Sequence, residues 1–356
     1  MIIVMNLIIE INYLYFFIFQ IFLNLFLFVN IKKISKKINI FDIPNERKIH
    51  KKKVPLLGGL FLFFNFVALF IFDLFFFNKI FYNELSLFDY KLIIIFLFST
   101  TVIFILGLLD DKYQISYEKK IIILLTVLFL NISTDENLQI DSLIFSITNF
   151  EINFYSNSVF FSLLCFLIYM NAINMFDGIN LQTSLTLLII YIFFIVLNIN
   201  LYFSIFLITF LIFFISQNFK GKIFLGDSGT LMLGYFTAFI LIKFYNAEGN
   251  SYTIYSDYIV SFMILPVIDL SRQFFDRIIK GKNPFYPDNN HLHHRILRKY
   301  NYNSSIITIV ILYSAPIFLN FLMEFKINIY LIFFSIIFYF IIIYHTRTNT
   351  PKKLIK

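Results

Sequence analysis

Two adjacent carboxylates, Asp110 and Asp111, end a long apolar run. Like charges this close together repel each other unless a proton or a cation compensates them. Magnesium does so in proteins that bind phosphate, because Mg²⁺ takes one or two carboxylates together with phosphate oxygens. The pair therefore indicates a phosphate–metal site, and the alternative is a solvated helix end whose partner is Lys112. Lys119 and Lys120 follow within two helical turns, as phosphate contacts or as interface anchors.

Three short polar side chains, Asn171, Asn174 and Asp177, fall on one predicted helical face. Their spacing of three residues places them nearly in line along a helix. Amide and carboxylate groups beside a membrane are costly unless they bind something, and helix capping accounts for only one of the three. The stretch, which continues to Asn180, therefore predicts a ligand site.

A glycine-flanked turn, Gly226-Asp227-Ser228-Gly229, precedes another apolar run. Such a turn offers backbone N–H groups at a helix N-terminus together with one carboxylate, which suits a phosphate or a metal–phosphate complex. The same residues are also an ordinary helix start, so the turn is a weak signal by itself.

Three of the five histidines, His291, His293 and His294, gather in one segment, and Arg295 follows directly. A zinc site is the competing interpretation, but the typical zinc spacing adds Cys or a remote carboxylate. On a helix, His291 and His294 share a face with Arg295 close by. This arrangement is better suited to holding a pyrophosphate.

A strongly basic segment, residues 32–55, contains Arg47, Lys48 and His50. One interpretation is attraction to anionic headgroups, worth about 1 kcal/mol per charge. The other is a site for a lipid-borne phosphate. The prolines and glycines embedded in and after this segment indicate a shaped loop rather than a simple tether.

These motifs lie between segments that only a membrane can accommodate. Of the 356 residues, 59% are hydrophobic and 14% are charged, whereas an average soluble domain is about 25% charged. This composition excludes a soluble enzyme and a disordered chain. The single cysteine, Cys165, excludes an intramolecular disulfide and a Cys-based zinc site. We predict an all-α, polytopic membrane protein that forms one domain over residues 1–356.

Eleven apolar runs are long enough to be membrane-spanning helices. They cover residues 3–30, 56–78, 92–109, 120–134, 155–171, 184–199, 201–216, 230–245, 258–271, 304–323 and 328–344. Of the 29 Lys and Arg residues, 25 lie in five alternate connecting segments and the C-terminal tail, which are residues 32–55, 110–120, 172–183, 217–229, 272–303 and 345–356. The other four are Lys79, Lys91, Lys243 and Lys326. The positive-inside rule places those segments in the cytoplasm, with the N-terminus outside and the C-terminus inside.

Three acidic residues lie toward the outer side of the membrane. Asp73, Glu84 and Glu248 fall toward it and are expected to be unpaired surface or loop residues. The polar stretch 133–154 is expected to be a long loop.

Taken together and in order, the five cytoplasmic segments resemble those of the polyprenyl-phosphate N-acetylhexosamine-1-phosphate transferases, the WecA/MraY superfamily. The resemblance covers about residues 40–300. It implies that Asp110 and Asp111 lie at the catalytic centre, where one carboxylate deprotonates or orients the lipid phosphate. It also implies that Asn174 and Asp227 hold Mg²⁺, with Mn²⁺ as an alternative.

The resemblance implies two further groups of residues for the substrates. The nucleotide-sugar is expected to contact Asp177, Asn180, His291, His293, His294 and Arg295. The lipid phosphate is expected to contact Lys120, Arg47, Lys48 and His50.

The implied reaction transfers a HexNAc-1-phosphate, such as GlcNAc-1-phosphate, from a UDP-sugar to undecaprenyl or another polyprenyl phosphate and releases UMP. This is a first membrane step of cell-envelope polysaccharide synthesis, for O-antigen, teichoic acid or a similar polymer. The resemblance implies the cell inner (plasma) membrane, a cytoplasmic active site and membrane lipid as partner. It leaves a homodimer open and gives no role to nucleic acid.

Two alternatives are a phospho-N-acetylmuramoyl-pentapeptide transferase of the same superfamily and a membrane transporter. Leu292 interrupts the histidine run, whereas the peptidoglycan branch usually has three consecutive histidines. A transporter would place ionisable groups near the middle of the membrane, but most lie at the cytoplasmic ends. Leu181 replaces a glycine that many members have, which leaves the sugar open.

Overall fold

The computed structural model describes residues 2–44, 50–76, 80–247, 254–284, 290–323 and 328–346, and only the backbone of 2–12, 76 and 80. Arg47, Lys48 and Glu248 therefore lie outside the described side chains. The described chain is mainly helical, as predicted, and forms two compact units. Two short antiparallel strand pairs were not predicted from the sequence.

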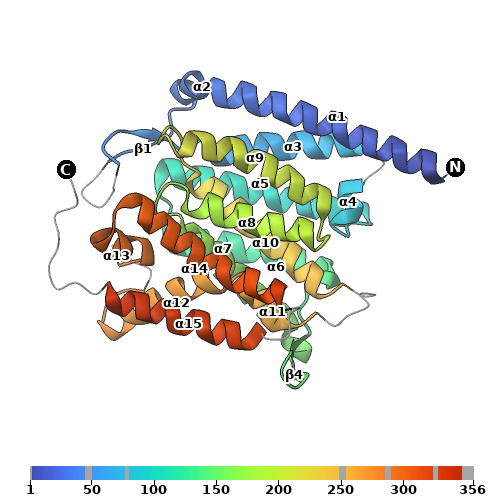
Figure 1. Ribbon diagram of the computed structural model, residues 1–356. Helices are drawn as coiled ribbons and strands as arrows, with labels where there is room; N and C mark the ends of the chain where they lie inside the picture. Colours follow the sequence, from blue (N-terminus) through green and yellow to red (C-terminus); the bar gives the residue numbers. More distant parts are fainter. Residues whose placement is uncertain are drawn as a thin grey trace. The chain divides into compact units, whose positions relative to one another are not determined.

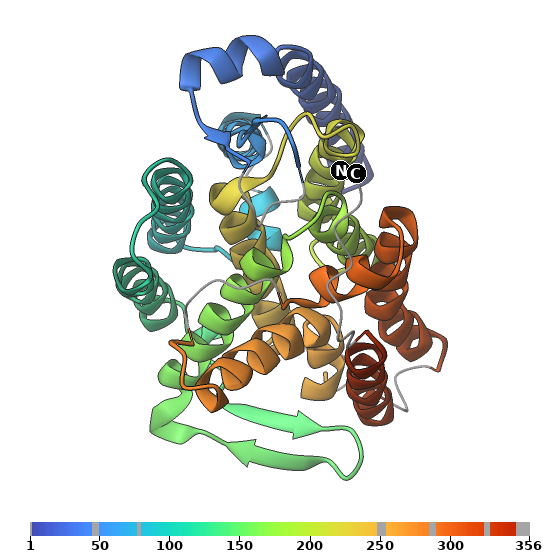
Figure 2. The ribbon, with the colours of Figure 1, turned by 90° about the vertical axis from the view of Figure 1, so that its left-hand side faces the viewer.

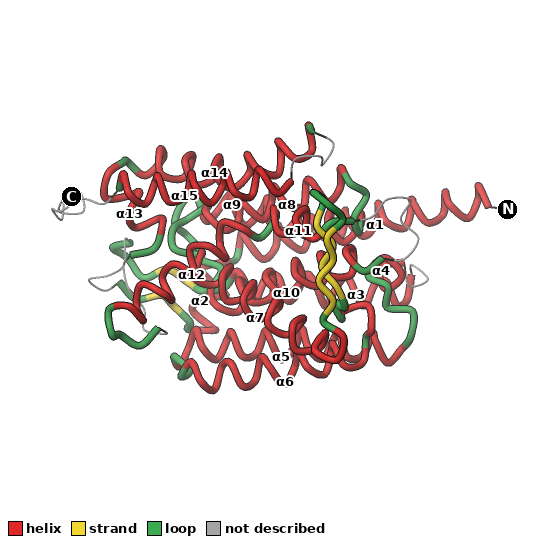
Figure 3. The backbone as a smooth tube through the Cα atoms, turned by 90° about the horizontal axis from the view of Figure 1, so that it is seen from below, coloured by secondary structure: helices red, strands yellow, loops and turns green. Residues whose placement is uncertain are grey.

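The first unit comprises Met1–Asp135 and Leu187–Phe236. Its elements are α1 (Ile2–Val29), α2 (Ile31–Ile38), β1 (Phe41–Asp42), β2 (Val54–Pro55), α3 (Gly58–Phe76), α4 (Ile80–Glu84), α5 (Tyr90–Tyr113), α6 (Tyr117–Thr134) and α9 (Leu201–Asn218). Helix α1 packs against α3 and α9 (Figure 1). Helices α5 and α6 run side by side (Figure 3), because the short connection after Tyr113 reverses the chain.

The second unit comprises Glu136–Thr186 and Thr237–Lys356. Its elements are the 3₁₀ turns Glu136–Leu138 and Tyr155–Asn157, β3 (Ser142–Phe145), β4 (Phe150–Asn153), α7 (Ser158–Phe176), α11 (Ser256–Ser261), α12 (Ile264–Ile279), α13 (Leu292–Lys299), α14 (Tyr302–Leu322) and α15 (Asn328–His345). Helix α12 packs on α7 and α15. Helices α8 (Gln182–Val196) and α10 (Gly226–Tyr245) contribute residues to both units.

All eleven predicted apolar runs are helical, and ten of them coincide with one helix each. Seven described helices are long and apolar enough to cross a membrane, or eight if α1 and α2, which meet at a 67° bend, form one broken span. These helices indicate a multi-pass membrane protein. The count of eleven spans and the N-out orientation stay predictions.

The ninth predicted run, 258–271, is broken into α11 and α12. In a continuous helix the Phe262 carbonyl would accept a hydrogen bond from the nitrogen of residue 266, but Pro266 has no N–H to donate. The Tyr313 hydroxyl donates to this carbonyl instead, at 2.5 Å. The break therefore leaves no unpaired backbone group at Phe262.

The stretch 133–154, predicted as a loop, contains the hairpin of β3 and β4 (Figure 2). Helix α11 anchors it from one side. The Ser256 hydroxyl donates to the Ile144 carbonyl at 2.9 Å, and the Asp257 carboxylate accepts from the Ser146 N–H at 3.1 Å.

The prediction that Asp73 and Glu84 are unpaired is wrong. The buried Asp73 carboxylate accepts from the N–H groups of Phe81 and Tyr82 at 3.2 and 3.1 Å, in the first turn of α4. Glu84 accepts from the N–H groups of Tyr202 and Phe203, each within 3.1 Å, in the first turn of α9. Both carboxylates cap helix N-termini, whose free N–H groups attract negative charge.

Candidate active site

The turn at the start of α10 is built around Asp111. Its carboxylate accepts from the Asp227 N–H at 2.7 Å, from the Ser228 N–H at 3.2 Å and from the Ser228 hydroxyl at 2.9 Å. Gly226 has a φ of +70°, which a side chain would strain, and a Cβ there would lie 2.5 Å from Asp111 Oδ2. Asp111 therefore fixes the backbone of this turn from α5.

Two other glycines let α3 and α5 approach the same turn. A Cβ on Gly59 would lie 2.3 Å from the Gly229 nitrogen, and one on Gly107 would lie 2.4 Å from Ser228 Cα. The Gly59 N–H donates to the Leu225 carbonyl at 2.9 Å. The sequence motifs around Gly59, Asp111 and Asp227 therefore lie next to one another in the first unit.

Lys120 joins the two remaining carboxylates of this region. Its ammonium group donates to Asp110 Oδ2 at 2.8 Å and also to Asp227 Oδ2. The other Asp110 oxygen accepts from the Ile115 N–H at 2.7 Å, which orients the carboxylate. The Lys120 side chain is only 8% exposed, whereas that of Asp227 is 33% exposed. We call Asp110, Asp111, Lys120 and Asp227 the acidic cluster.

His50 is the one described member of the predicted basic lipid-phosphate group on the segment 32–55. Its Nε2 lies 2.8 Å from Asp42 Oδ2, and its ring centroid lies 5.3 Å from that of Phe224, two residues before Gly226. Arg47 and Lys48 lie outside the described residues, so this part of the prediction is untested.

In the second unit, the polar stretch predicted at 171–180 spans the end of α7. Asn171 is buried, and its amide donates to the Leu167 carbonyl at 2.7 Å. Asn174 is half-buried, and Asp177 stands directly after the last residue of α7. The Asn180 carbonyl accepts from the Tyr302 hydroxyl at 2.9 Å. The predicted helical face is therefore present up to Phe176, where the helix ends.

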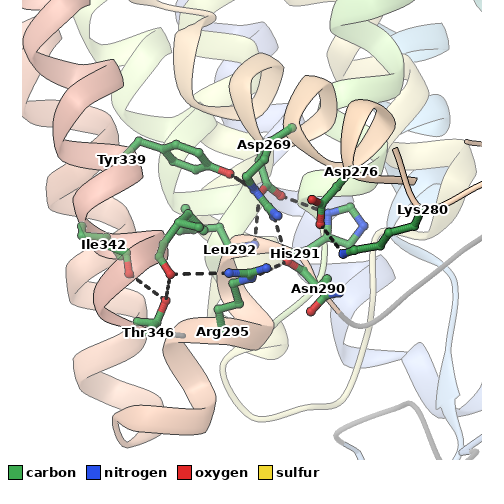
Figure 4. Close-up of polar contacts among 12 residues, drawn as sticks. Asp269, Asp276, Lys280, Asn290, His291, Leu292, Arg295, Tyr339, Ile342 and Thr346 are labelled. Atoms are coloured by element: carbon green, nitrogen blue, oxygen red, sulfur yellow. Dashed lines mark hydrogen bonds and ion pairs between the residues drawn. The ribbon is translucent and has the colours of Figure 1, made fainter. Parts of the chain in front are cut away.

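The histidine segment is held by Asp269 of α12 (Figure 4). One carboxylate oxygen lies 3.0 Å from His291 Nδ1. The other accepts from the Leu292 N–H at 3.1 Å, from Arg272 at 2.9 Å and from the Tyr339 hydroxyl at 2.7 Å. Four donors thus saturate one buried carboxylate. We call Asp269, Arg272, His291, His293 and Tyr339 the histidine cluster.

His293 lies against the end of α7. A Cβ on Gly178 would lie 2.0 Å from the His293 ring, so only glycine fits beside it. Burial, together with the neighbouring His294 and His291, holds the pKa of His293 well below its usual range. The ring is therefore neutral at pH 7, and its buried Nδ1 has no hydrogen-bond partner among the described residues. The ring centroid of His294 is 4.2 Å from that of His293.

Arg295, predicted to contact the pyrophosphate, donates instead to backbone carbonyls. Its Nε donates to the Asn290 carbonyl at 3.2 Å, and Nη1 reaches the Ile343 carbonyl of α15 at 3.4 Å. The predicted role of Arg295 stays a hypothesis.

Sequence reasoning missed Asp269, Arg272, Ser228 and Tyr339. A signal existed for the first two, because a charged pair three residues apart at the end of an apolar run is unusual in a membrane protein. Tyr339 gave no signal, since it lies among the other aromatic residues of the last apolar run.

The acidic cluster fits a magnesium ion by the chemistry of its donors. Asp110 and Asp227 already share one cationic group, and carboxylate oxygens are the ligands that Mg²⁺ prefers. Among the described residues, no group of three or more His, Cys, Asp or Glu side chains could hold a metal alone. Mg²⁺ that is held by one or two carboxylates usually takes substrate phosphate oxygens as further ligands.

Comparisons with known proteins agree with the motifs. The family model of glycosyl transferase family 4 matches residues 93–245. A probable undecaprenyl-phosphate N-acetylglucosaminyl 1-phosphate transferase of Bacillus subtilis (strain 168) is 30% identical over 284 residues, which cover 75% of this chain and 72% of that protein. An undecaprenyl-phosphate alpha-N-acetylglucosaminyl 1-phosphate transferase of Thermotoga maritima is 30% identical over 268 residues, 74% of this chain and 75% of that protein. A protein of the same name from Escherichia coli O157:H7 is 26% identical over 294 residues, 78% of this chain and 74% of that protein.

Proposed function

The chain belongs to glycosyl transferase family 4, on its WecA-like branch. From this premise we propose that it transfers GlcNAc-1-phosphate, or the 1-phosphate of a related amino sugar, from a UDP-sugar to undecaprenyl phosphate. UMP is the second product. The relatives with this activity in their names are matched over about three quarters of their length. The transporter alternative gains no support from any contact described above.

The observation that carries the proposal is the ammonium of Lys120 between Asp110 and Asp227. The reaction brings two anionic phosphates together, so its site must supply positive charge. That charge must also be available to the leaving group, because negative charge moves to it during the reaction. A partly exposed carboxylate pair that shares one buried ammonium is suited to this task.

In the proposed reaction, a phosphate oxygen of the lipid forms a bond to the phosphorus that carries the sugar. The bond between that phosphorus and the bridging oxygen of UMP breaks, and UMP leaves with the electron pair. Lys120 neutralises phosphate charge, and Asp110 orients or deprotonates the lipid phosphate. Asp111 is the other candidate for this role, and its three hydrogen bonds with the α10 turn also hold the Asp227 backbone in place.

We propose that Asp227 and Asn174 hold Mg²⁺, for which Mn²⁺ can substitute. When bound, the ion supplies charge neutralisation at the transferring phosphoryl group. Asp177, Asn180 and the histidines of segment 291–294 are proposed to bind the nucleotide-sugar, and His50 with Arg47 and Lys48 the lipid phosphate. The proposal includes eleven spans, the inner membrane and a cytoplasmic active site.

The test uses purified protein in detergent with undecaprenyl phosphate, Mg²⁺ and a panel of UDP-HexNAc donors, with UMP release as the measurement. We expect release that requires both the lipid and Mg²⁺, and the best donor identifies the sugar. Asp227→Asn should reduce release about 1,000-fold, whereas Glu118→Gln, an exposed change close to Lys120 on α6, should leave it unchanged. A folded wild-type protein that releases no UMP with any donor contradicts the proposal.

A further inference from the structure

The last described helix, α15, contacts the histidine segment through the C-terminal end of the helix. The final carbonyls of a helix have no partners within it. In α15 the Ile343 carbonyl accepts from Arg295, and the His345 carbonyl accepts from Lys299 Nζ at 3.1 Å. Both cations belong to α13, and positive charge is favourable at a helix C-terminus. Helix α13 is therefore docked on the end of α15.

A second contact lies one turn earlier in α15. Tyr339 is fully buried, and its hydroxyl makes two short hydrogen bonds with α12. It donates to Asp269 Oδ1 at 2.7 Å and accepts from Arg272 Nε at 2.6 Å. The hydroxyl thus lies between the carboxylate and the guanidinium, and it fixes both.

The two groups that Tyr339 fixes are the ones that hold the histidine segment. Asp269 binds the His291 ring and the Leu292 N–H, and Arg272 donates to the Asn290 carbonyl at 2.8 Å. Three consecutive residues before and at the start of α13 are therefore tied to one buried ion pair. Figure 4 shows this chain of contacts from Tyr339 to Asn290, His291 and Leu292.

The consequence concerns His293, which makes no hydrogen bond of its own through Nδ1. The path of the backbone from His291, the neighbouring rings of His291 and His294 and the packing against Gly178 set the position of its ring. A small shift at the start of α13 therefore displaces this ring. Displacements of about 1 Å are enough to reduce catalysis about 100-fold.

We propose that Tyr339 of α15 is a positioning residue, which holds Asp269 and Arg272 so that the histidine segment keeps the geometry needed for the donor nucleotide-sugar. The inference deepens the proposed function and rests on it. It assigns to the last apolar run, outside all five sequence motifs, a role in donor recognition. It also assigns to Arg295 the docking of α13 on α15.

The test compares Tyr339→Phe with Tyr344→Phe, a change on the same helix at an exposed tyrosine. Removing the Tyr339 hydroxyl removes its hydrogen bond to the Asp269 carboxylate and its hydrogen bond from the Arg272 guanidinium. We expect the KM for the UDP-sugar to rise about tenfold, while the KM for undecaprenyl phosphate stays unchanged. A purely structural role would lower the amount of active protein and leave both KM values unaltered.

Hydrogen exchange supplies a readout that needs no turnover. In Tyr339→Phe the Leu292 amide, measured in a peptide covering 290–299, should exchange about tenfold faster than in the wild type or in Tyr344→Phe. Unchanged exchange overturns the proposed positioning. Faster exchange with an unaltered KM for the donor overturns the link to the reaction.

The two proposals fail separately. If the wild type releases no UMP while Tyr339→Phe speeds exchange at Leu292, the proposed function is wrong, and the tie between α15 and α13 stands without its role in donor binding. Arg272→Lys is a second variant, in case Tyr339→Phe does not fold. It keeps the charge but loses the planar donors to Asp269 and Tyr339, and the same shift in KM is expected.

Discussion

The acidic cluster and the histidine cluster use carboxylates in opposite ways. Asp227 is one-third exposed and shares a single ammonium with Asp110, so these carboxylates can exchange one cation for another. Asp269 is 4% exposed and saturated by four donors from α12, α15 and the histidine segment. The carboxylates of the acidic cluster can therefore change their cationic partner during a reaction, whereas Asp269 of the histidine cluster keeps its partners.

The largest effect is expected for Asp227→Asn, which breaks the exchangeable pair. Losing this charge should reduce kcat for UMP release about 1,000-fold. Thermal stability should stay near that of the wild type, because Lys120 keeps Asp110 as partner. The measurement is turnover together with a melting curve, and a variant that loses stability in proportion to activity would remove the distinction between the clusters.

Lys120→Met removes the ammonium of the acidic cluster, whereas the previous variant removes a carboxylate of the same cluster. Two facing carboxylates then lack a cation, so the concentration of Mg²⁺ needed for half-maximal rate should fall. The rate itself should drop about 100-fold, since the phosphates lose a fixed positive charge. A Mg²⁺ titration of UMP release checks both, and an increased Mg²⁺ requirement would show that Lys120 does not compete for the cation position.

Asp269→Asn should lower the stability of the protein more than its activity. The variant leaves the buried Arg272 without the carboxylate of Asp269. Removing one member of a buried ion pair lowers the free energy of unfolding by about 3 kcal/mol. Activity should fall only moderately in the protein that stays folded. Thermal unfolding of the purified variant measures the loss. The conservative change Asp276→Asn, in the partly exposed Lys280 ion pair of the same helix, is the matched control and should leave the melting temperature nearly unchanged.

The smallest effect on activity is expected for Glu84→Gln, far from both clusters in the sequence. Burial raises the pKa of Glu84 to about 7, although the N–H groups of Tyr202 and Phe203 lower it. Because the folded-state pKa lies above the ordinary value of about 4.3, the protonated form is favoured by folding. Stability from this group is therefore present at pH 4 and lost as the pH rises through 7.

The measurement for Glu84 is the melting temperature of wild type and variant between pH 4 and 8. The wild type should lose stability toward pH 8 relative to Glu84→Gln, and UMP release at pH 7 should be equal. If the melting temperatures of the two proteins change with pH in the same way, ionisation of Glu84 does not affect stability and the prediction is wrong.

Much of the fold could be predicted from hydropathy, since each apolar run is helical. The break at Phe262 had a signal in Pro266, but the donor to the freed carbonyl, Tyr313, comes from a distant helix and could not be predicted. In the site, Asp111 and Asp227 were recognised from their local sequence, but the bonds between them depend on the approach allowed by Gly107. Asp73 and Glu84 were misjudged because a carboxylate that caps a helix looks, in sequence, like one in solvent.

The hydrogen bonds between Asp111 and the α10 turn join residues 116 and 117 positions apart. During synthesis, α5 therefore enters the membrane long before the donors of its last carboxylate exist. A chain that ends before α10 has the acidic end of α5 without the N–H and hydroxyl donors of the α10 turn. Assembly order thus separates insertion from activity: a ribosome-bound chain that stops before Gly226 contains all of α5 and no acidic cluster.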